Sequence, residues 1–308
     1  MLQNFLTVGQ QVLVLFLLIG IGFVCGKTQL FGERTAKGMA NLVLTVATPC
    51  MIVQSFQYEM QAKLLRDLLL AMLFAAVLHI VMIGVANVLF REKEEARRRV
   101  LKFAMVFSNA GYMALPLQEA VLGAEGVFYG AAYIAVFNIT LWSWGLWEMS
   151  GDKKSLTAKK LIINPGLIGV AVGFGLFITS FHLPAVLEAP VRNLAALNTP
   201  LPMLIIGYHL SKSDVFKALR DRRALLAIGF RNVVLPLAAL GVTYLCGMRG
   251  TLLVSCTIAA SAPVAAATSM FAAKYDRDVE LSVNLVSLST LFSVISMPLI
   301  VGLAKTLP

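Results

Sequence analysis

The chain has 308 residues, of which 58% are hydrophobic and only 14% are charged, and its mean hydropathy is +0.81. A soluble domain carries about 45–50% apolar and about 25% charged residues, so this composition excludes an ordinary soluble protein. The net charge of +10 does not indicate nucleic-acid binding, because the basic residues gather in short runs between long apolar segments.

Ten apolar segments follow one another along the chain, each close to the about 20 residues that a helix needs to cross a bilayer. They cover residues 5–25, 39–56, 68–90, 100–120, 127–147, 165–181, 193–210, 223–246, 251–273 and 279–303. The sequence therefore predicts an all-α integral membrane protein with ten transmembrane helices.

The basic residues predict the orientation of these helices. Of the 26 Lys and Arg residues, 20 fall in or beside the loops that follow the first, third, fifth, seventh and ninth segments, and five fall on the opposite side. Cytoplasmic loops carry the excess of Lys and Arg in membrane proteins. We therefore expect a multi-pass protein of the cell membrane with its N-terminus and its C-terminus outside.

The two halves of the chain share landmarks. Thr48–Pro49 in the second segment corresponds to Thr199–Pro200 in the seventh, at an offset of 151 residues, and Ser108 corresponds to Ser261 at an offset of 153. Because each half has five helices, the second half is expected to be inverted in the membrane, an architecture typical of secondary transporters. We predict a first repeat over residues 1–147, a cytoplasmic connecting loop over 148–163, and a second, inverted repeat over 164–308.

Two helices carry residues that interrupt helical geometry near the middle of the bilayer. The fourth reads FSNAGYMALPL and contains Pro116, and the ninth reads AASAPVAAATSM. Unwound backbone is tolerated at membrane depth where it lines a cavity or is buried in protein. A helix that restarts after such a break presents free N–H groups and about half a positive charge, which suits an anion. The predicted substrate-binding residues at the two breaks are Ser108, Asn109, Ala110, Gly111, Tyr112, Ser261, Ala262, Pro263 and Val264.

Other residues in the segments have a structural interpretation, and two of them also have a functional one. Structural bends that frame the site are predicted at five residues of the second and seventh segments: Thr48, Pro49, Thr199, Pro200 and Pro202. Arg231 either extends toward the inner surface or balances substrate charge and acts as a gate. His79 is either a packed neutral ring or a group that couples transport to protons.

The motifs resemble the auxin efflux carrier family over nearly the whole chain. That family has an N-x-x-x-M-G-x-P-L pattern in its fourth helix, which Asn109, Met113, Pro116 and Leu117 match here, while Ala114 replaces the glycine. The C-terminal part also resembles the family in Phe271–Tyr275 and Met297–Leu299, and Asn164–Pro165 at the sixth segment fits the pattern too. The short loop 148–163 is typical of a bacterial-type member.

The resemblance implies two inverted five-helix repeats in which helices 4 and 9 cross at the midplane. It implies a scaffold of helices 1, 2, 6 and 7 and a transport core of helices 3–5 and 8–10. It also implies elevator-type alternating access and transport of a small organic anion, such as malate, malonate or an auxin-like acid.

Several alternatives remain open at this point. The sodium-coupled bile-acid symporters share the architecture, but segment 251–273 lacks the acidic residue of their sodium site. A weaker sodium site near Ser108 and Asn138 would make the coupling ion Na⁺ instead of H⁺. A channel and a non-transporting sensor on the same fold are further alternatives. We expect no enzyme activity, metal site or other cofactor. The GxxxG spacings indicate either intramolecular packing or a homodimer.

Overall fold

The computed structural model describes residues 2–152, 163–213 and 219–307. Over this part of the chain the secondary structure is helical, apart from one isolated antiparallel bridge between Ser108 and Val264. Most of the predicted connecting loop 148–163 lies outside the described residues. The expectation of an all-α protein is confirmed.

The described first half, residues 2–152, contains seven α-helices and three π-helical turns. The helices are α1 (Leu2–Lys27), α2 (Glu33–Leu42), α3 (Thr48–Ser55), α4 (Ala62–Leu89), α5 (Glu95–Val106), α6 (Leu115–Thr140) and α7 (Leu146–Ser150). The turns are η1 (Val43–Ala47), η2 (Ala110–Ala114) and η3 (Leu141–Gly145). Gly123 kinks α6 with φ 69°, a conformation that glycine adopts without steric cost, and so separates the predicted fourth and fifth helices.

The described part of the second half is built similarly. Its α-helices are α9 (Pro165–Thr179), α10 (Ala185–Ala195), α11 (Pro200–Lys212), α13 (Arg222–Gly229), α14 (Leu235–Leu245), α15 (Gly250–Ser261), α16 (Ala267–Lys274) and α17 (Val279–Ala304). The 3₁₀ turn η5 (Ala196–Asn198) precedes α11, and the π-helical turn η6 (Phe230–Val234) joins α13 to α14.

Six helical stretches of the described chain are long and apolar enough to cross a membrane. They are Leu6–Lys27, Glu33–Ser55, Ala62–Leu89, Ala110–Ser150, Arg222–Leu245 and Val279–Ala304. Exposed Leu69, Leu73 and Val77 lie one turn apart on α4 and form an apolar stripe on its outer face. A stripe of this kind suits contact with lipid.

Proline accounts for three of the π-helical turns. Pro49, Pro116 and Pro236 each stand two residues after the last residue of η1, η2 or η6. Proline has no backbone N–H, so the carbonyl oxygen four residues earlier loses its usual helical hydrogen bond. The helix widens by one residue at this turn, and its hydrogen bonds join residues five positions apart instead of four. At Thr48–Pro49 the helix therefore continues with altered geometry and does not unwind. The bend at Thr199–Pro200 follows the 3₁₀ turn η5.

The two bends lie against each other. The Thr48 hydroxyl donates to Oδ1 of Asn198 over 2.6 Å, and Asn198 is fully buried. Pro49 also packs against Gly169 of α9, where an added Cβ would lie 2.9 Å from the Pro49 Cα. Thr199 contacts Glu119 of α6 through side-chain oxygens 3.5 Å apart. The bends thus join segments that are far apart in the sequence.

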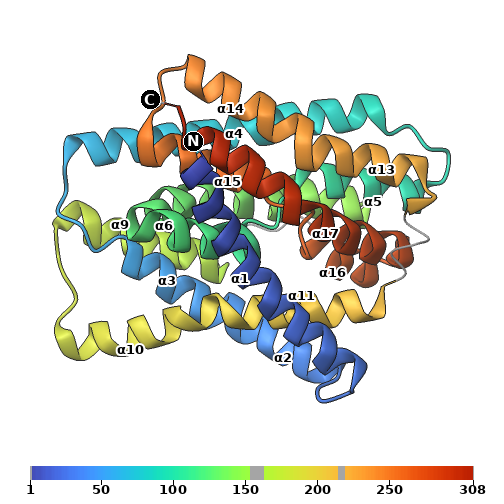
Figure 1. Ribbon diagram of the computed structural model, residues 1–308, viewed down its shortest axis with the longest axis horizontal. Helices are drawn as coiled ribbons and strands as arrows, with labels where there is room; N and C mark the ends of the chain where they lie inside the picture. Colours follow the sequence, from blue (N-terminus) through green and yellow to red (C-terminus); the bar gives the residue numbers. More distant parts are fainter. Residues whose placement is uncertain (1, 153–162, 214–218, 308) are drawn as a thin grey trace.

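Glycines bring helices of the two halves into close contact. A Cβ on Gly22 of α1 would lie 2.3 Å from the Leu204 carbonyl oxygen of α11, and one on Gly207 would lie 2.0 Å from the Ile19 carbonyl oxygen. Gly173 packs in the same way on Phe56, next to α3. Two of the GxxxG spacings therefore serve packing within the chain. In Figure 1, α2, α3, α10 and α11 lie in the lower part of the view, and α4, α13 and α14 lie in the upper part.

One predicted boundary is wrong. The seventh segment was expected to begin at residue 193, but α10 already begins at Ala185. Polar residues in this stretch lower its hydropathy, so the hydropathy pattern does not predict a membrane helix there. The same residues are compatible with a helix, because Glu188 and Arg192 lie one turn apart and form an ion pair with an N–O distance of 4.0 Å. Hydropathy identifies the part of a helix that faces lipid and misses polar turns at its end.

Candidate functional site

The two interrupted helices meet through their unwound segments. The backbone N–H of Asn109 donates to the Pro263 carbonyl oxygen over 2.7 Å, and the N–H of Ala265 donates to the Phe107 carbonyl oxygen over 3.0 Å. Ser108 and Val264 face each other between these bonds as an antiparallel bridge. The two breaks thus satisfy part of each other's backbone, as buried backbone N–H and C=O groups require.

The sequence explains why the chain unwinds at these points. Ala262 precedes Pro263, and a residue before proline is driven out of the helical region; its φ/ψ of −61°/142° is extended. Phe107, after α5, is also extended, with φ/ψ of −96°/120°. Both helices restart within a few residues, as η2 and as α16.

The restarting helices carry free backbone donors. The first amide of η2, that of Ala110, donates to the Ser108 carbonyl oxygen over 2.8 Å, but the next two, those of Gly111 and Tyr112, have no backbone acceptor among the described residues. Neither do the amides of Ala266 and Ala267 at the start of α16. The first turn of any helix leaves such N–H groups unpaired and carries about half a positive charge. Two helix starts of this kind therefore lie on either side of one backbone crossing.

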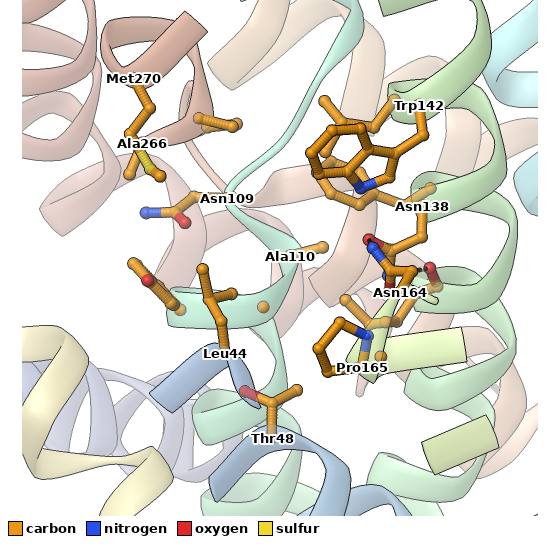
Figure 2. Close-up of a pocket in the computed structure, with 18 of the residues that line it drawn as sticks. Leu44, Thr48, Asn109, Ala110, Asn138, Trp142, Asn164, Pro165, Ala266 and Met270 are labelled. Atoms are coloured by element: carbon orange, nitrogen blue, oxygen red, sulfur yellow. Dashed lines mark hydrogen bonds between the residues drawn. The ribbon is translucent and has the colours of Figure 1, made fainter. Parts of the chain in front are cut away.

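A cavity of about 250 Å³ lies beside this crossing. Its wall is formed by residues of both breaks together with η1, α6, η3 and the start of α9 (Figure 2). The polar residues in its lining are Asn41, Thr45, Thr48, Ser108, Asn109, Tyr112, Asn138 and Asn164. Among the described residues, Asp, Glu, Lys, Arg and His are absent from this lining, so these residues stabilise an entering charge by their dipoles.

Two side-chain donors at the cavity have no partner in the described part of the chain. Asn109 is 4% exposed and Tyr112 is 6% exposed, and neither the Asn109 Nδ2 nor the Tyr112 hydroxyl makes a hydrogen bond. An unpaired buried donor costs about 1–3 kcal/mol. Such a cost is offset when a ligand with acceptor oxygens binds, and Asn109 and Tyr112 are the strongest candidates for that contact.

The opposite wall is formed by a second polar pair. Asn164 caps α9 by accepting from the Leu167 N–H over 3.1 Å, and its Nδ2 donates to Oδ1 of Asn138 over 3.2 Å. Asn138 in turn donates to the Ile134 carbonyl oxygen over 3.0 Å. Figure 2 shows this pair with Pro165 on one side of the cavity and Asn109 on the other. The pair is already hydrogen-bonded, unlike Asn109.

The structure divides the predicted binding residues into two groups. Every residue from Ser108 to Tyr112 lines the cavity, whereas Ser261, Ala262, Pro263 and Val264 do not. The Ser261 hydroxyl donates to the Thr257 carbonyl oxygen over 2.6 Å and is fully buried. The second helix instead contributes Ala265, Ala266 and Ala267, which the sequence analysis missed. Proline indicates where a helix ends, and the free amides come only where the next helix starts.

Arg231 and His79 lie inside the protein and outside the cavity lining. Arg231 does not extend toward the inner surface as one interpretation held: it is 0% exposed and donates to the carbonyl oxygens of Ala260 and Ala262, over 3.0 and 3.2 Å. It thereby pairs the last carbonyls of α15, where a cation is favourable. His79 is 2% exposed and packs among aromatic rings.

Comparison with known proteins gives one family. The sequence model of the family described as "Membrane transport protein" matches residues 7–301. An uncharacterized transporter of Methanothermobacter thermautotrophicus is 25% identical over 295 residues, which cover 94% of this chain and 96% of that protein. The uncharacterized transporter MJ1031 of Methanocaldococcus jannaschii is 23% identical over 303 residues, covering 92% of this chain and 94% of the relative.

Proposed function

The chain belongs to this membrane transport family, the auxin efflux carrier family that its motifs resemble, and we propose that it is a secondary transporter of a small organic anion. It is thus a multi-pass membrane transporter and not an enzyme. The substrate and the mechanism that follow are our proposal.

One observation carries the choice of an anion. The cavity at the crossing presents the unpaired donors of Asn109 and Tyr112 together with the free amides of two helix starts. All of these groups donate hydrogen bonds, and the helix starts add positive potential. A carboxylate is a pure acceptor with two oxygens, so it matches this set, whereas an ammonium group does not.

The remaining lining supports two classes of acid. The Asn138–Asn164 pair offers amide groups to a second polar end, as in malate or malonate. Phe137, Trp142 and Phe271 offer aromatic faces to an apolar body, as in an auxin-like acid. Because no Lys or Arg lines the cavity in the part of the chain that the structure describes, a second full negative charge has no cation there to pair with, which favours the monocarboxylate.

The packing supports the inverted repeat. α1 of the first half packs on α11 of the second, and α9 of the second half packs on α3 of the first, each through glycines. This reciprocal packing is what two repeats of five predicted helices, related by a pseudo-two-fold axis, would give. We propose that α1–α3 and α9–α11 form the scaffold and that the helices α4–α7 and α13–α17 form the transport core, with both termini outside.

The position of the cavity supports an elevator movement. Its wall includes η1 and the start of α9 from the proposed scaffold, and η2, α6 and α16 from the proposed core. Within the core, Gln118 donates to the Ser255 hydroxyl over 3.0 Å, and Arg277 donates to the Met149 carbonyl oxygen over 2.7 Å. A core tied together in this way can move as one body with the substrate.

Equilibrium binding tests the proposal. Purified protein in lipid nanodiscs is titrated with labelled malate, malonate and an indole carboxylate, and each is compared with its uncharged amide analogue. Saturable binding of one acid and none of its amide supports an anion site. Equal binding of acid and amide, or binding of neither, contradicts it.

A further inference from the structure

Two basic side chains are buried at matching places in the two halves. His79 of α4 and Arg231 of η6 are 152 residues apart, between the offsets of 151 and 153 that relate the helix breaks. The His79 ring lies 6.0 Å from that of Phe107, the residue that follows α5. Arg231 donates to Ala260 and Ala262 at the end of α15. Each basic group therefore lies where the first part of an interrupted helix ends.

The basic nitrogen of His79 is free. Its Nδ1 lies 2.7 Å from the Ala75 carbonyl oxygen, and a carbonyl only accepts, so Nδ1 carries the hydrogen. Nε2 then carries a lone pair and is buried without a hydrogen-bond partner in the described structure. The neutral ring is thus oriented with one vacant site for a proton.

The surroundings of this nitrogen contain a fixed positive charge. The ionisable groups facing the ring, among described residues, are Arg231 from η6 and Tyr133 from α6, whose ring centroid lies 5.3 Å away. Cys256 on α15 is a further buried titratable group that acts electrostatically on Tyr133, and Phe107, which follows α5, presents an apolar ring to His79. A proton on His79 would therefore add a second positive charge beside Arg231, with no carboxylate facing it to compensate.

An anion in the cavity would supply the missing negative charge. The Tyr133 hydroxyl lies 3.2 Å from the Ser108 hydroxyl, and Ser108 lines the cavity. Phe137 also lines the cavity, and the centroid of its ring lies 6.2 Å from the centroid of the His79 ring. His79 is thus separated from the proposed substrate by one layer of side chains, across which charges interact strongly in a water-poor interior.

We propose that His79 is the proton-binding group of the transporter and that a proton and the substrate anion bind together. The anion favours the proton on Nε2, and by linkage the proton favours the anion by the same factor. With a monocarboxylate the loaded core carries no added net charge, so one proton and one anion cross in the same direction. His79 acts as a positioning residue that does not touch the substrate. This inference rests on the proposed function.

The test measures binding of the labelled acid to protein in nanodiscs at pH 6 and pH 8, where a carboxyl group of pKa about 4 stays ionised throughout. Wild-type protein is expected to bind about ten times more tightly at pH 6, within the usual range of such couplings. Calorimetry in two buffers of different ionisation enthalpy should show uptake of close to one proton per anion at pH 6 and of little at pH 8, since a tenfold change over two pH units corresponds to about half a proton on average.

Two variants and a control make the result specific. His79→Asn keeps an amide donor near the position of Nδ1, and His79→Gln places its amide nearer the position of Nε2. Neither side chain has a titratable nitrogen, so either variant should bind the acid with equal affinity at both pH values. His209→Asn alters an exposed histidine in the last turn of α11 and should behave like wild type.

The outcomes separate this inference from the proposed function. Binding by wild-type protein without pH dependence, or pH dependence that persists in both folded His79 variants, overturns the role of His79 and leaves the anion site standing. Absence of binding at either pH overturns the anion site, and the proton-coupling inference with it.

Discussion

The backbone N–H of Asn109 donates to the carbonyl oxygen of Pro263 across 2.7 Å, although the two residues lie in different halves of the chain. This bond fixes the two unwound segments against each other and so determines where both helices restart. As a consequence, the free amides of Gly111 and Ala266 and the unpaired Asn109 side chain border one uncharged cavity. The proposed anion site depends on this relationship.

Substitution of Asn109 should weaken substrate binding without disturbing the fold. A hydrogen bond to a charged group contributes about 1.5–3 kcal/mol, so Asn109→Ala should lower the affinity for the acid roughly 10- to 100-fold. Removing the side chain also removes a buried unpaired donor, so thermal stability should not fall. Asn87→Ala, which alters an exposed contact to Lys102, is the control and should bind normally. Unchanged affinity in Asn109→Ala would remove Asn109 from the site.

Two neighbouring glycines of α1 should respond with opposite sign to alanine. A Cβ on Gly22 would lie 2.3 Å from the Leu204 backbone oxygen, so Gly22→Ala must separate α1 from α11 and should cost about 1–3 kcal/mol. Gly20 has no atom within 4 Å of an added Cβ, so Gly20→Ala should be neutral or stabilise the helix by about 0.5–1 kcal/mol. Thermal unfolding of the detergent-purified variants measures both; equal melting temperatures would contradict the close contact.

Asp221 should contribute stability that depends on pH. Burial raises the pKa of its carboxyl group, but the hydrogen bond from Arg97 and the backbone N–H groups of Ala224 and Arg223 outweigh burial and lower the pKa below its ordinary value. The stabilisation is therefore fully present above the unfolded pKa of about 3.9 and is lost as the pH falls through the lower folded pKa.

Asp221→Asn keeps an N-cap acceptor and removes the charge that faces Arg97 and the helix start, so it should lower the free energy of unfolding by about 0.3–1 kcal/mol at pH 7. The difference from wild type should stay constant down to about pH 4.5 and shrink below it, because the wild-type carboxylate is then protonated. Glu188→Gln, which breaks an exposed ion pair with Arg192, should have little effect at any of these pH values. A difference that grows as the pH falls would contradict the sign of the pKa shift.

Cross-linking tests the elevator movement. Glu119 and Thr199, with side-chain oxygens 3.5 Å apart, join the proposed core to the proposed scaffold. Cysteines at both positions, in a chain whose four native cysteines are replaced, should stop uptake when bridged by mercuric ion and recover with excess thiol. The matched pair Gln118 and Ser255 lies within the core, 3.0 Å apart, and bridging cysteines there should leave uptake intact. Uptake that survives the first bridge would argue against relative movement of these parts.

The sequence predicted the helical membrane fold and the positions of the two breaks, because proline and glycine act locally and leave a readable pattern. It did not predict that Ala265–Ala267 of the second break line the cavity. An alanine side chain does not mark a binding residue in a sequence, and the groups that matter here are backbone amides. Nor did it place Arg231, whose partners are carbonyls of α15 about 30 positions away in the sequence. Contacts of this kind depend on how helices pack, and a hydropathy pattern does not contain that information.

The most direct measurement of the central claim is uptake of labelled acid into proteoliposomes, with proton and sodium gradients imposed separately and Asn109→Ala measured beside wild type. We expect saturable uptake of one organic acid by wild-type protein, accumulation driven by the proton gradient, and a strongly reduced rate in Asn109→Ala at equal protein content. Absence of uptake of every acid under both gradients, or uptake that Asn109→Ala leaves unchanged, would contradict an anion carrier whose site lies at the helix crossing.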